Sequence, residues 1–187
     1  EKLCAFFHHP EPVRVLLTAG ATAALNLAIK GSLRPGSRVL VSAMEHNAVM
    51  RPLVQLGVDF TRVPCDATGR LDVDALERGL REKPEMLILN HASNVSGTVQ
   101  DAKMVGKLCK QYDVPFVLDA AQSAGHVPVD FAEFSLSALA VPAHKGLLGP
   151  QGIGALLVTQ AFAAQLSPLI AGGTGSMSNS EELPPYL

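Results

Sequence analysis

Seven short apolar runs, each about the length of a β-strand, alternate along the chain with segments that have a helical period. Several runs are almost continuously apolar, which is typical of parallel strands that helices cover on both faces. The pattern therefore predicts an α/β fold of three layers (α/β/α) around a mostly parallel seven-stranded sheet. The predicted strands are 13–18, 38–42, 59–64, 86–90, 114–119, 137–141 and 154–158.

Four intervening segments have the apolar spacing expected of amphipathic helices. Gly31 is interpreted as a C-terminal stop for the first, and Pro52 weakens the second because proline cannot donate a backbone hydrogen bond. Asp72 is well suited to cap the start of the third. The predicted helices are 21–30, 47–55, the stretch after Asp72, and 103–112.

The composition excludes several classes of partner. A length of 187 residues with 48% hydrophobic residues provides one sizeable core, and the net charge of −2 does not favour binding to nucleic acid or to an anionic membrane surface. No apolar run approaches the roughly 20 residues needed to span a bilayer. The three cysteines form no C-x-x-C pair, which favours free thiols in a reducing, cytoplasmic setting, and no metal site is expected.

Two charged residues stand at or shortly after the ends of predicted strands, where ligands of α/β sheets gather. Asp119 follows an apolar run and precedes Gln122 by three residues. It could cap a helix, or it could face a cationic ligand nitrogen in a dry site. Lys145 lies between an apolar run and a glycine-rich loop. Lysines are usually solvated, but apolar neighbours lower the pKa of the amine and allow it to form a Schiff base.

Two further strand ends carry weaker signals. Gly20 and Thr22 form a turn into a helix, a place where backbone N–H groups bind anions, although such residues are also common at ordinary helix starts. His91 and Asn94 follow the run 86–90, and a buried core histidine beside a polar turn explains them equally well.

Taken in order, these strand ends resemble the fold-type I enzymes that use pyridoxal 5′-phosphate (PLP), and within them the class V aminotransferase and cysteine desulfurase family. The resemblance covers nearly the whole chain. The motifs that carry it are MEHNAV (44–49), HASNVSGT (91–98), DAAQSAGHVPVD (119–130), HKGLLGPQGIG (144–154) and GGTGS (172–176).

The resemblance implies a role for each residue at these strand ends. Asp119 pairs with the protonated pyridine nitrogen of PLP, Lys145 forms the Schiff base, and His91 stacks on the ring, so these three form the expected catalytic set. Pro142 departs from the family, which commonly has a phosphate-binding Ser or Thr there, and the role of His46 is left open. The residues expected to bind the cofactor are Ala21, Thr22, His91, Asn94, Asp119, Gln122, His144 and Lys145.

By the same resemblance, residues 1–170 are a PLP-binding large domain that is incomplete on its N-terminal side. Residues 171–187 are a loop leading towards a missing C-terminal region. In the family that region supplies an Arg for the substrate carboxylate and, in desulfurases, a mobile Cys nucleophile. Cys4, Cys65 and Cys109 match neither.

The implied function is that of a PLP-dependent enzyme of sulfur metabolism acting on an amino acid. A cysteine desulfurase, or an enzyme like selenocysteine lyase, is the first interpretation, with cysteine or selenocysteine as substrate and a possible sulfur-acceptor protein. The alternatives are a class V aminotransferase and a non-catalytic cofactor-binding fragment. The full-length protein is expected to be a homodimer, and the isolated chain is expected to be inactive.

Overall fold

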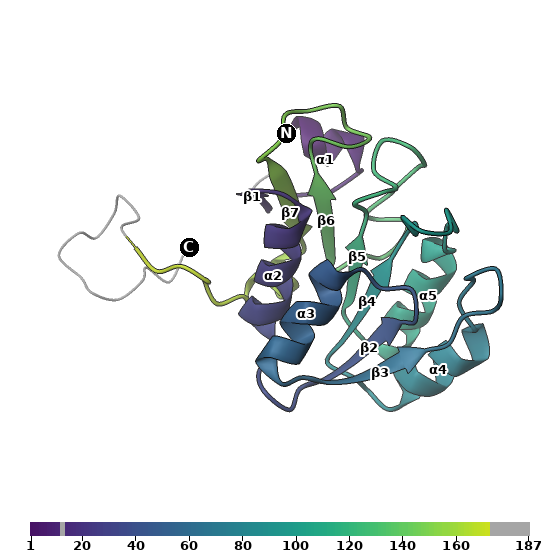
Figure 1. Ribbon diagram of the computed structural model, residues 1–187. Helices are drawn as coiled ribbons and strands as arrows, with labels where there is room; N and C mark the ends of the chain where they lie inside the picture. The colour runs from purple at the N-terminus through teal and green to yellow at the C-terminus, as the bar shows by residue number, and fades with distance from the viewer. Residues whose placement is uncertain (12–13, 173–187) are drawn as a thin grey trace.

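A single seven-stranded sheet forms the centre of the molecule in the computed structural model, which describes residues 1–11 and 14–172 (Figure 1). The strands lie in the order β1-β7-β6-β5-β4-β2-β3. Their bounds are β1 Val15–Thr18, β2 Arg38–Ser42, β3 Asp59–Val63, β4 Met86–Asn90, β5 Phe116–Asp119, β6 Ala138–Pro142 and β7 Gly154–Val158.

The sheet is mixed but mostly parallel. The pairs β2–β3, β2–β4, β4–β5 and β5–β6 are parallel, whereas β7 is antiparallel to both β1 and β6. Strand β1 therefore runs in the same direction as β2–β6, and the carboxyl ends of these six strands meet at one edge. The predicted fold class is confirmed.

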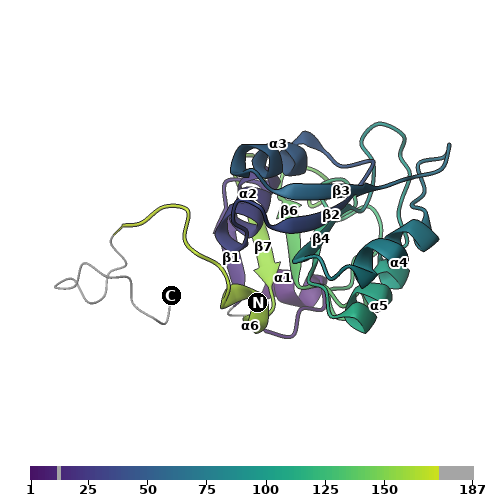
Figure 2. The same cartoon turned by 90° about the horizontal axis from the view of Figure 1, so that it is seen from below.

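Helices cover both faces of the sheet (Figure 2). One face carries α2 (Ala21–Ser32) and α3 (Asn47–Leu56), and the other carries α1 (Lys2–Phe6), α4 (Val73–Arg81) and α5 (Ala102–Tyr112). The short α6 (Gln160–Ala163) follows β7. No helix in the described ranges is long and apolar enough to cross a membrane.

The alternation of side chains along a strand divides the core into two apolar clusters. In β4, Leu87 and Leu89 join the cluster that includes Leu76 of α4 and Val105 of α5. Met86 and Ile88 join the cluster that includes residues of α2 and α3 such as Leu25 and Leu53. Burial on both faces explains why β4, β6 and β7, which are buried along their whole length, are almost continuously apolar.

Aspartate side chains cap the starts of α4 and α5, and the first of these two caps was predicted. The Asp72 carboxylate accepts a hydrogen bond from the backbone N–H of Ala75 at 2.9 Å, which confirms the predicted cap of α4. Asp101 caps α5 in the same way, accepting from Met104 N at 2.9 Å. Each bond satisfies a backbone donor that has no partner inside its helix.

Two helix boundaries differ from the sequence prediction. Gly31 does not stop α2, which continues to Ser32; a Cβ on Gly31 would lie 2.9 Å from the carbonyl oxygen of Ser167, so the glycine allows that segment to pack closely. Pro52 does not interrupt α3 either: the helix continues through it, and the residue is buried. Proline removes only one backbone hydrogen-bond donor from the helix.

Part of the predicted organisation lies beyond the described residues. Residues 173–187 carry most of the GGTGS motif and most of the predicted loop 171–187, and they lie outside the described residues. The division of the chain into a domain 1–170 and a following loop stays a prediction.

Candidate functional site

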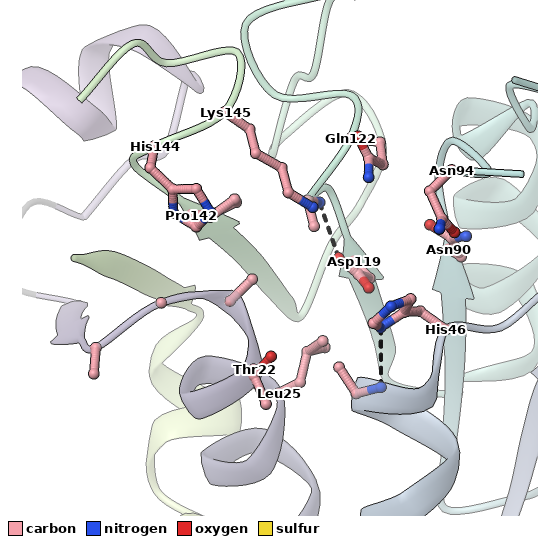
Figure 3. A pocket seen from close by; sticks show the side chains of 15 residues that line it. Thr22, Leu25, His46, Asn90, Asn94, Asp119, Gln122, Pro142, His144 and Lys145 are labelled. Atoms are coloured by element: carbon pink, nitrogen blue, oxygen red, sulfur yellow. Dashed lines mark hydrogen bonds between the residues drawn. The ribbon is translucent and has the colours of Figure 1, made fainter. Parts of the chain in front are cut away.

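A cavity of about 230 Å³ opens at the sheet edge where the carboxyl ends of β4, β5 and β6 meet the starts of α2 and α3 (Figure 3). Polar residues from widely separated parts of the chain line it together with small apolar ones. The lining residues are Ala19, Gly20, Ala21, Thr22, Leu25, His46, Ala48, Asn90, Asn94, Asp119, Ala121, Gln122, Pro142, His144 and Lys145.

Asp119 is the last residue of β5 and only 2% of it is exposed. One carboxylate oxygen accepts a hydrogen bond from Ala121 N at 2.9 Å. Burial raises the pKa of Asp119, while the hydrogen bond from Ala121 and the nearby charges of His46 and Lys145 lower it. The site thus holds a desolvated acid that a cationic hydrogen-bond donor would stabilise as the carboxylate.

Lys145 lies on the loop that follows β6 and reaches across the cavity towards Asp119 and Gln122 (Figure 3). Backbone hydrogen bonds fold this loop tightly: Gly149 N donates to Ala143 O at 2.8 Å, and Ala143 N donates to Ile153 O at 2.9 Å. The lysine is only partly exposed. The loop therefore places an amine opposite a buried acid, across a gap lined by small side chains.

Glycines let the loop of Lys145 rest directly on the turn after Gln122. A Cβ on Gly125 would lie 2.2 Å from the carbonyl oxygen of Gly146, and a Cβ on Gly146 would lie 2.3 Å from that of Ala124. Gly125 also has φ +84°, in the left-handed region that favours glycine. The two segments that carry Lys145 and Gln122 are therefore in backbone contact.

The start of α2 forms another wall of the cavity. Its N-cap is Gly20, which provides no side-chain cap, so backbone N–H groups of the first turn remain available to a ligand. The strand β7 approaches closely here, since a Cβ on Gly154 would lie 2.6 Å from the Gly20 Cα. The Thr22 hydroxyl and the His144 ring also line the cavity, and together these groups suit an anion.

His46 also lines the cavity and lies beside Asp119 (Figure 3). It is the N-cap of α3, and its Nδ1 accepts a hydrogen bond from Ala48 N at 3.0 Å. The neutral ring then carries its proton on Nε2. Sequence reasoning left this residue without a role, although it belongs to the MEHNAV motif.

His91 lies apart from the residues that line the cavity. It is 3% exposed, and its ring packs edge-on against Phe134 with centroids 5.8 Å apart. Burial lowers the pKa of His91 to about 4, so the ring is neutral at physiological pH, and Nδ1 has no hydrogen-bond partner among the described residues. Its neighbour Asn90 lines the cavity instead. The ring-stacking role of His91 stays a prediction.

The cavity therefore gathers seven of the eight residues that the sequence marked for cofactor binding. They come from four segments of the chain and share one sheet edge, as strand-end residues of a parallel sheet should. The seven are Ala21, Thr22, Asn94, Asp119, Gln122, His144 and Lys145.

Residues 1–183 match the Aminotransferase class-V family. The chain belongs to this family. It is 36% identical, over 167 residues, to the cysteine desulfurase IscS of Dictyoglomus turgidum, an alignment that covers 86% of this chain and 42% of the relative. The resemblance inferred from the motifs is thereby confirmed.

Solved structures agree with the fold. The apo cysteine desulfurase from Thermococcus onnurineus NA1 superposes with a TM-score of 0.84 at 28% identity, covering 91% of this chain and 44% of that one. A structure of SspA in complex with cysteine gives a TM-score of 0.82 at 32% identity, covering 91% and 50%. The chain thus spans half or less of the length of these relatives.

Proposed function

We propose that the cavity binds PLP, and that Asp119 and Lys145 hold opposite sides of the cofactor. The observation that carries this proposal is a buried carboxyl with a raised pKa that faces a lysine across a cavity at the sheet edge. When bound, PLP supplies an aldehyde that a lysine amine can attack and a ring that withdraws electrons when its nitrogen is protonated. The donor set fits that group, because a protonated ring nitrogen would give the buried Asp119 carboxylate a cationic N–H donor.

The remaining residues suit the other parts of the cofactor. The free backbone N–H groups at Ala21 and Thr22, with the Thr22 hydroxyl and His144, are placed to hold a phosphate. Gln122 and Asn94 offer amide donors to a ring oxygen. Pro142 also lines the cavity and provides neither a hydroxyl nor an N–H, so in our proposal the α2 start and His144 hold the phosphate without a donor from this position.

We propose that the whole protein is a cysteine desulfurase or an enzyme like selenocysteine lyase. The relatives named cysteine desulfurase and the SspA complex with cysteine support this choice of substrate class. The Lys145 amine, when it is not bonded to the cofactor, would be able to move a proton at the substrate Cα. A sulfur-acceptor protein, a homodimer and a reducing, cytoplasmic setting complete the proposal.

The sulfur-accepting thiol is not expected among the three cysteines of this chain. Cys4 and Cys109 are buried, and burial raises the pKa of Cys109 to about 12. Burial also raises the pKa of Cys65. Nucleophilic cysteines need the opposite shift, because the thiolate is the reactive form.

The test of PLP binding is covalent trapping. The protein is incubated with PLP, scanned for the absorbance of the bound cofactor, reduced with borohydride and digested for mass spectrometry. We expect one labelled lysine, Lys145, and loss of both label and absorbance in Lys145→Ala. Lys107→Ala, an exposed lysine on α5, is the control and should behave like wild type. Specific labelling of another lysine would contradict the proposal.

A class V aminotransferase is the second candidate, because the matched family is named for that reaction. The two activities differ in product. A desulfurase releases alanine from cysteine and leaves sulfur on a thiol, whereas an aminotransferase yields a keto acid and an aminated cofactor. Product analysis of the PLP-loaded protein with cysteine separates the two, and absence of turnover with intact PLP binding would favour a cofactor-binding fragment.

A further inference from the structure

A second acid lies beside the cavity without lining it. Glu45 stands between the end of β2 and the start of α3, next to His46. Its oxygen Oε1 accepts two hydrogen bonds, from the Ser42 hydroxyl at 2.6 Å and from the backbone N–H of Asn90 at 2.8 Å. The other oxygen, Oε2, is buried and has no hydrogen-bond partner among the described residues.

The two hydrogen bonds connect neighbouring strands. Ser42 ends β2 and Asn90 ends β4, and these strands pair in parallel. Two further bonds close the same turn: Met44 N donates to the Ser42 hydroxyl oxygen at 3.1 Å, and the Asn90 amide donates to Met44 O at 3.2 Å. The Glu45 carboxyl is therefore the centre of a buried polar network that fixes the turn 42–45 on the end of β4.

The electrostatic surroundings of Glu45 differ from those of Asp119. His46 and Lys145 lower the pKa of Asp119, whereas the charge that acts on Glu45 is that of Asp119 itself. Cys65, beyond β3, is the other titratable group that interacts with Glu45. Burial is the main cause that raises the pKa of Glu45, to about 8, and the negative charge of Asp119 adds to the rise.

The hydrogen-bond geometry of Glu45 and the charge of its neighbour both favour the protonated carboxylic acid. Oε1 already accepts two donors, so a proton on this carboxyl belongs on Oε2. An unpaired buried hydroxyl costs less free energy than an unpaired buried anion. The register of the sheet pairs Asn90 with Asp119, so an ionised Glu45 would place a like charge one strand away from the acid that lines the cavity.

We propose that Glu45 is a positioning residue that acts as a neutral carboxylic acid, tying the end of β2 to the end of β4 and leaving Asp119 as the single carboxylate of the site. The link to Asp119 as partner of the PLP nitrogen rests on the proposed function. The protonation state and the bridging role do not, because they concern residues that the cofactor does not contact.

The first test is infrared spectroscopy of the protein, with or without PLP. At pH 6.5, we expect a carbonyl stretch of a protonated carboxylic acid that disappears in Glu45→Gln and remains in the control Glu82→Gln, an exposed acid at the end of α4. In wild type the band should fade as the pH rises through about 8. A spectrum without this band, or a band that survives Glu45→Gln, would overturn the assignment.

The second test separates a neutral acid from an anion. The amide oxygen of Gln can accept both hydrogen bonds, so Glu45→Gln should retain PLP like wild type at pH 7. Glu45→Ala leaves the Asn90 N–H buried without an acceptor, and we expect it to weaken PLP retention about tenfold or more. If Glu45→Gln loses PLP as severely as Glu45→Ala, the anion is needed and the proposal is wrong.

The two proposals fail separately in these experiments. A protein with the Glu45 infrared band that does not bind PLP would refute the cofactor assignment and leave the neutral acid in place. A protein that labels at Lys145 but has no such band would do the reverse. Should Glu45→Ala fail to fold, the infrared spectrum and the Gln variant still decide the question.

Discussion

The backbone contact between the loop of Lys145 and the turn after Gln122 is open to a direct test with alanine. In Gly146→Ala, the new Cβ would begin 2.3 Å from the carbonyl oxygen of Ala124, whereas real Cβ atoms essentially never come within 3.0 Å. The loop must therefore move by about 0.7 Å. The Ala124 oxygen belongs to the backbone and the new Cβ is bonded to it, so neither can turn aside as a flexible side chain would. Lys145, the neighbouring residue, must therefore move with the loop.

Three glycine variants separate the sources of the cost. Gly146→Ala adds the clash alone, since Gly146 is outside the left-handed region. Gly152→Ala adds the left-handed strain alone, because Gly152 has φ +78° with nothing within 4 Å of its Cβ position. Gly125→Ala, with φ +84° and a 2.2 Å contact, adds both. We expect losses of about 1–3 kcal/mol from overpacking and about 1–2 kcal/mol from strain.

The assays are the free energy of unfolding and the rate of covalent PLP attachment at Lys145. Gly125→Ala should lose about 2–5 kcal/mol and Gly152→Ala only about 1–2 kcal/mol, because the unfolded-state entropy of the added methyl is common to both. A misplacement near 1 Å should slow attachment at Lys145 on the order of tenfold to hundredfold in Gly146→Ala, but not in Gly152→Ala. Equal losses in Gly125→Ala and Gly152→Ala, or a wild-type attachment rate in Gly146→Ala, would refute the reasoning.

Three further predictions concern single acids. Burial raises the pKa of Glu45 from 4.5 to about 8, so between these pH values the folded protein holds a proton that the unfolded chain has lost. The free energy of unfolding should therefore fall by about 1.4 kcal/mol per pH unit as the pH rises from about 4.5 to 8. Glu45→Gln should remove this slope, which urea titrations across that pH range would measure. Asp119→Asn should weaken PLP binding, as measured by equilibrium dialysis. It also removes the free-energy cost of burying an ionisable carboxyl in the protein without PLP, so the melting temperature should not fall. Asp72→Ala should destabilise the protein by about 1 kcal/mol through loss of the bond to Ala75 N and leave PLP labelling unchanged.

The fold was largely predictable because burial on both faces forces an apolar strand sequence. Each of the seven predicted runs overlaps one observed strand, and the order of runs and helices indicated a mostly parallel sheet. The reversal of β7 was not predictable, since an apolar pentamer has the same pattern in either direction. Gly31 and Pro52 were misread for a related reason: their meaning depends on the segments that pack against them, here Ser167 and the core under α3.

The location of the candidate site at the carboxyl ends of the strands was predictable, but only some of its residues were. Strand-end position identified Asp119 and Lys145, because polar groups directly after buried strands need a reason to be there. The buried network around Glu45 gave no such signal. An acid next to a histidine at a helix start is explained by capping, and only the three-dimensional contact with Asn90 reveals that the carboxyl bridges two strands.

The different positions of Asn90 and His91 follow from the period-two geometry of β4. Met86 and Ile88 face the α2–α3 layer, and Asn90 is the next residue on that face. Leu89 faces the α4–α5 layer, and His91 is the next residue on that opposite face, where its ring contacts Phe134. In the sheet Asn90 pairs with Asp119, which follows Val117 on the α2–α3 side. The cavity opens against the start of α2, so side chains of this parity line it directly. A residue of the opposite parity, such as His91, can take part only from above the strand end, and a one-residue shift of β4 would exchange the two roles.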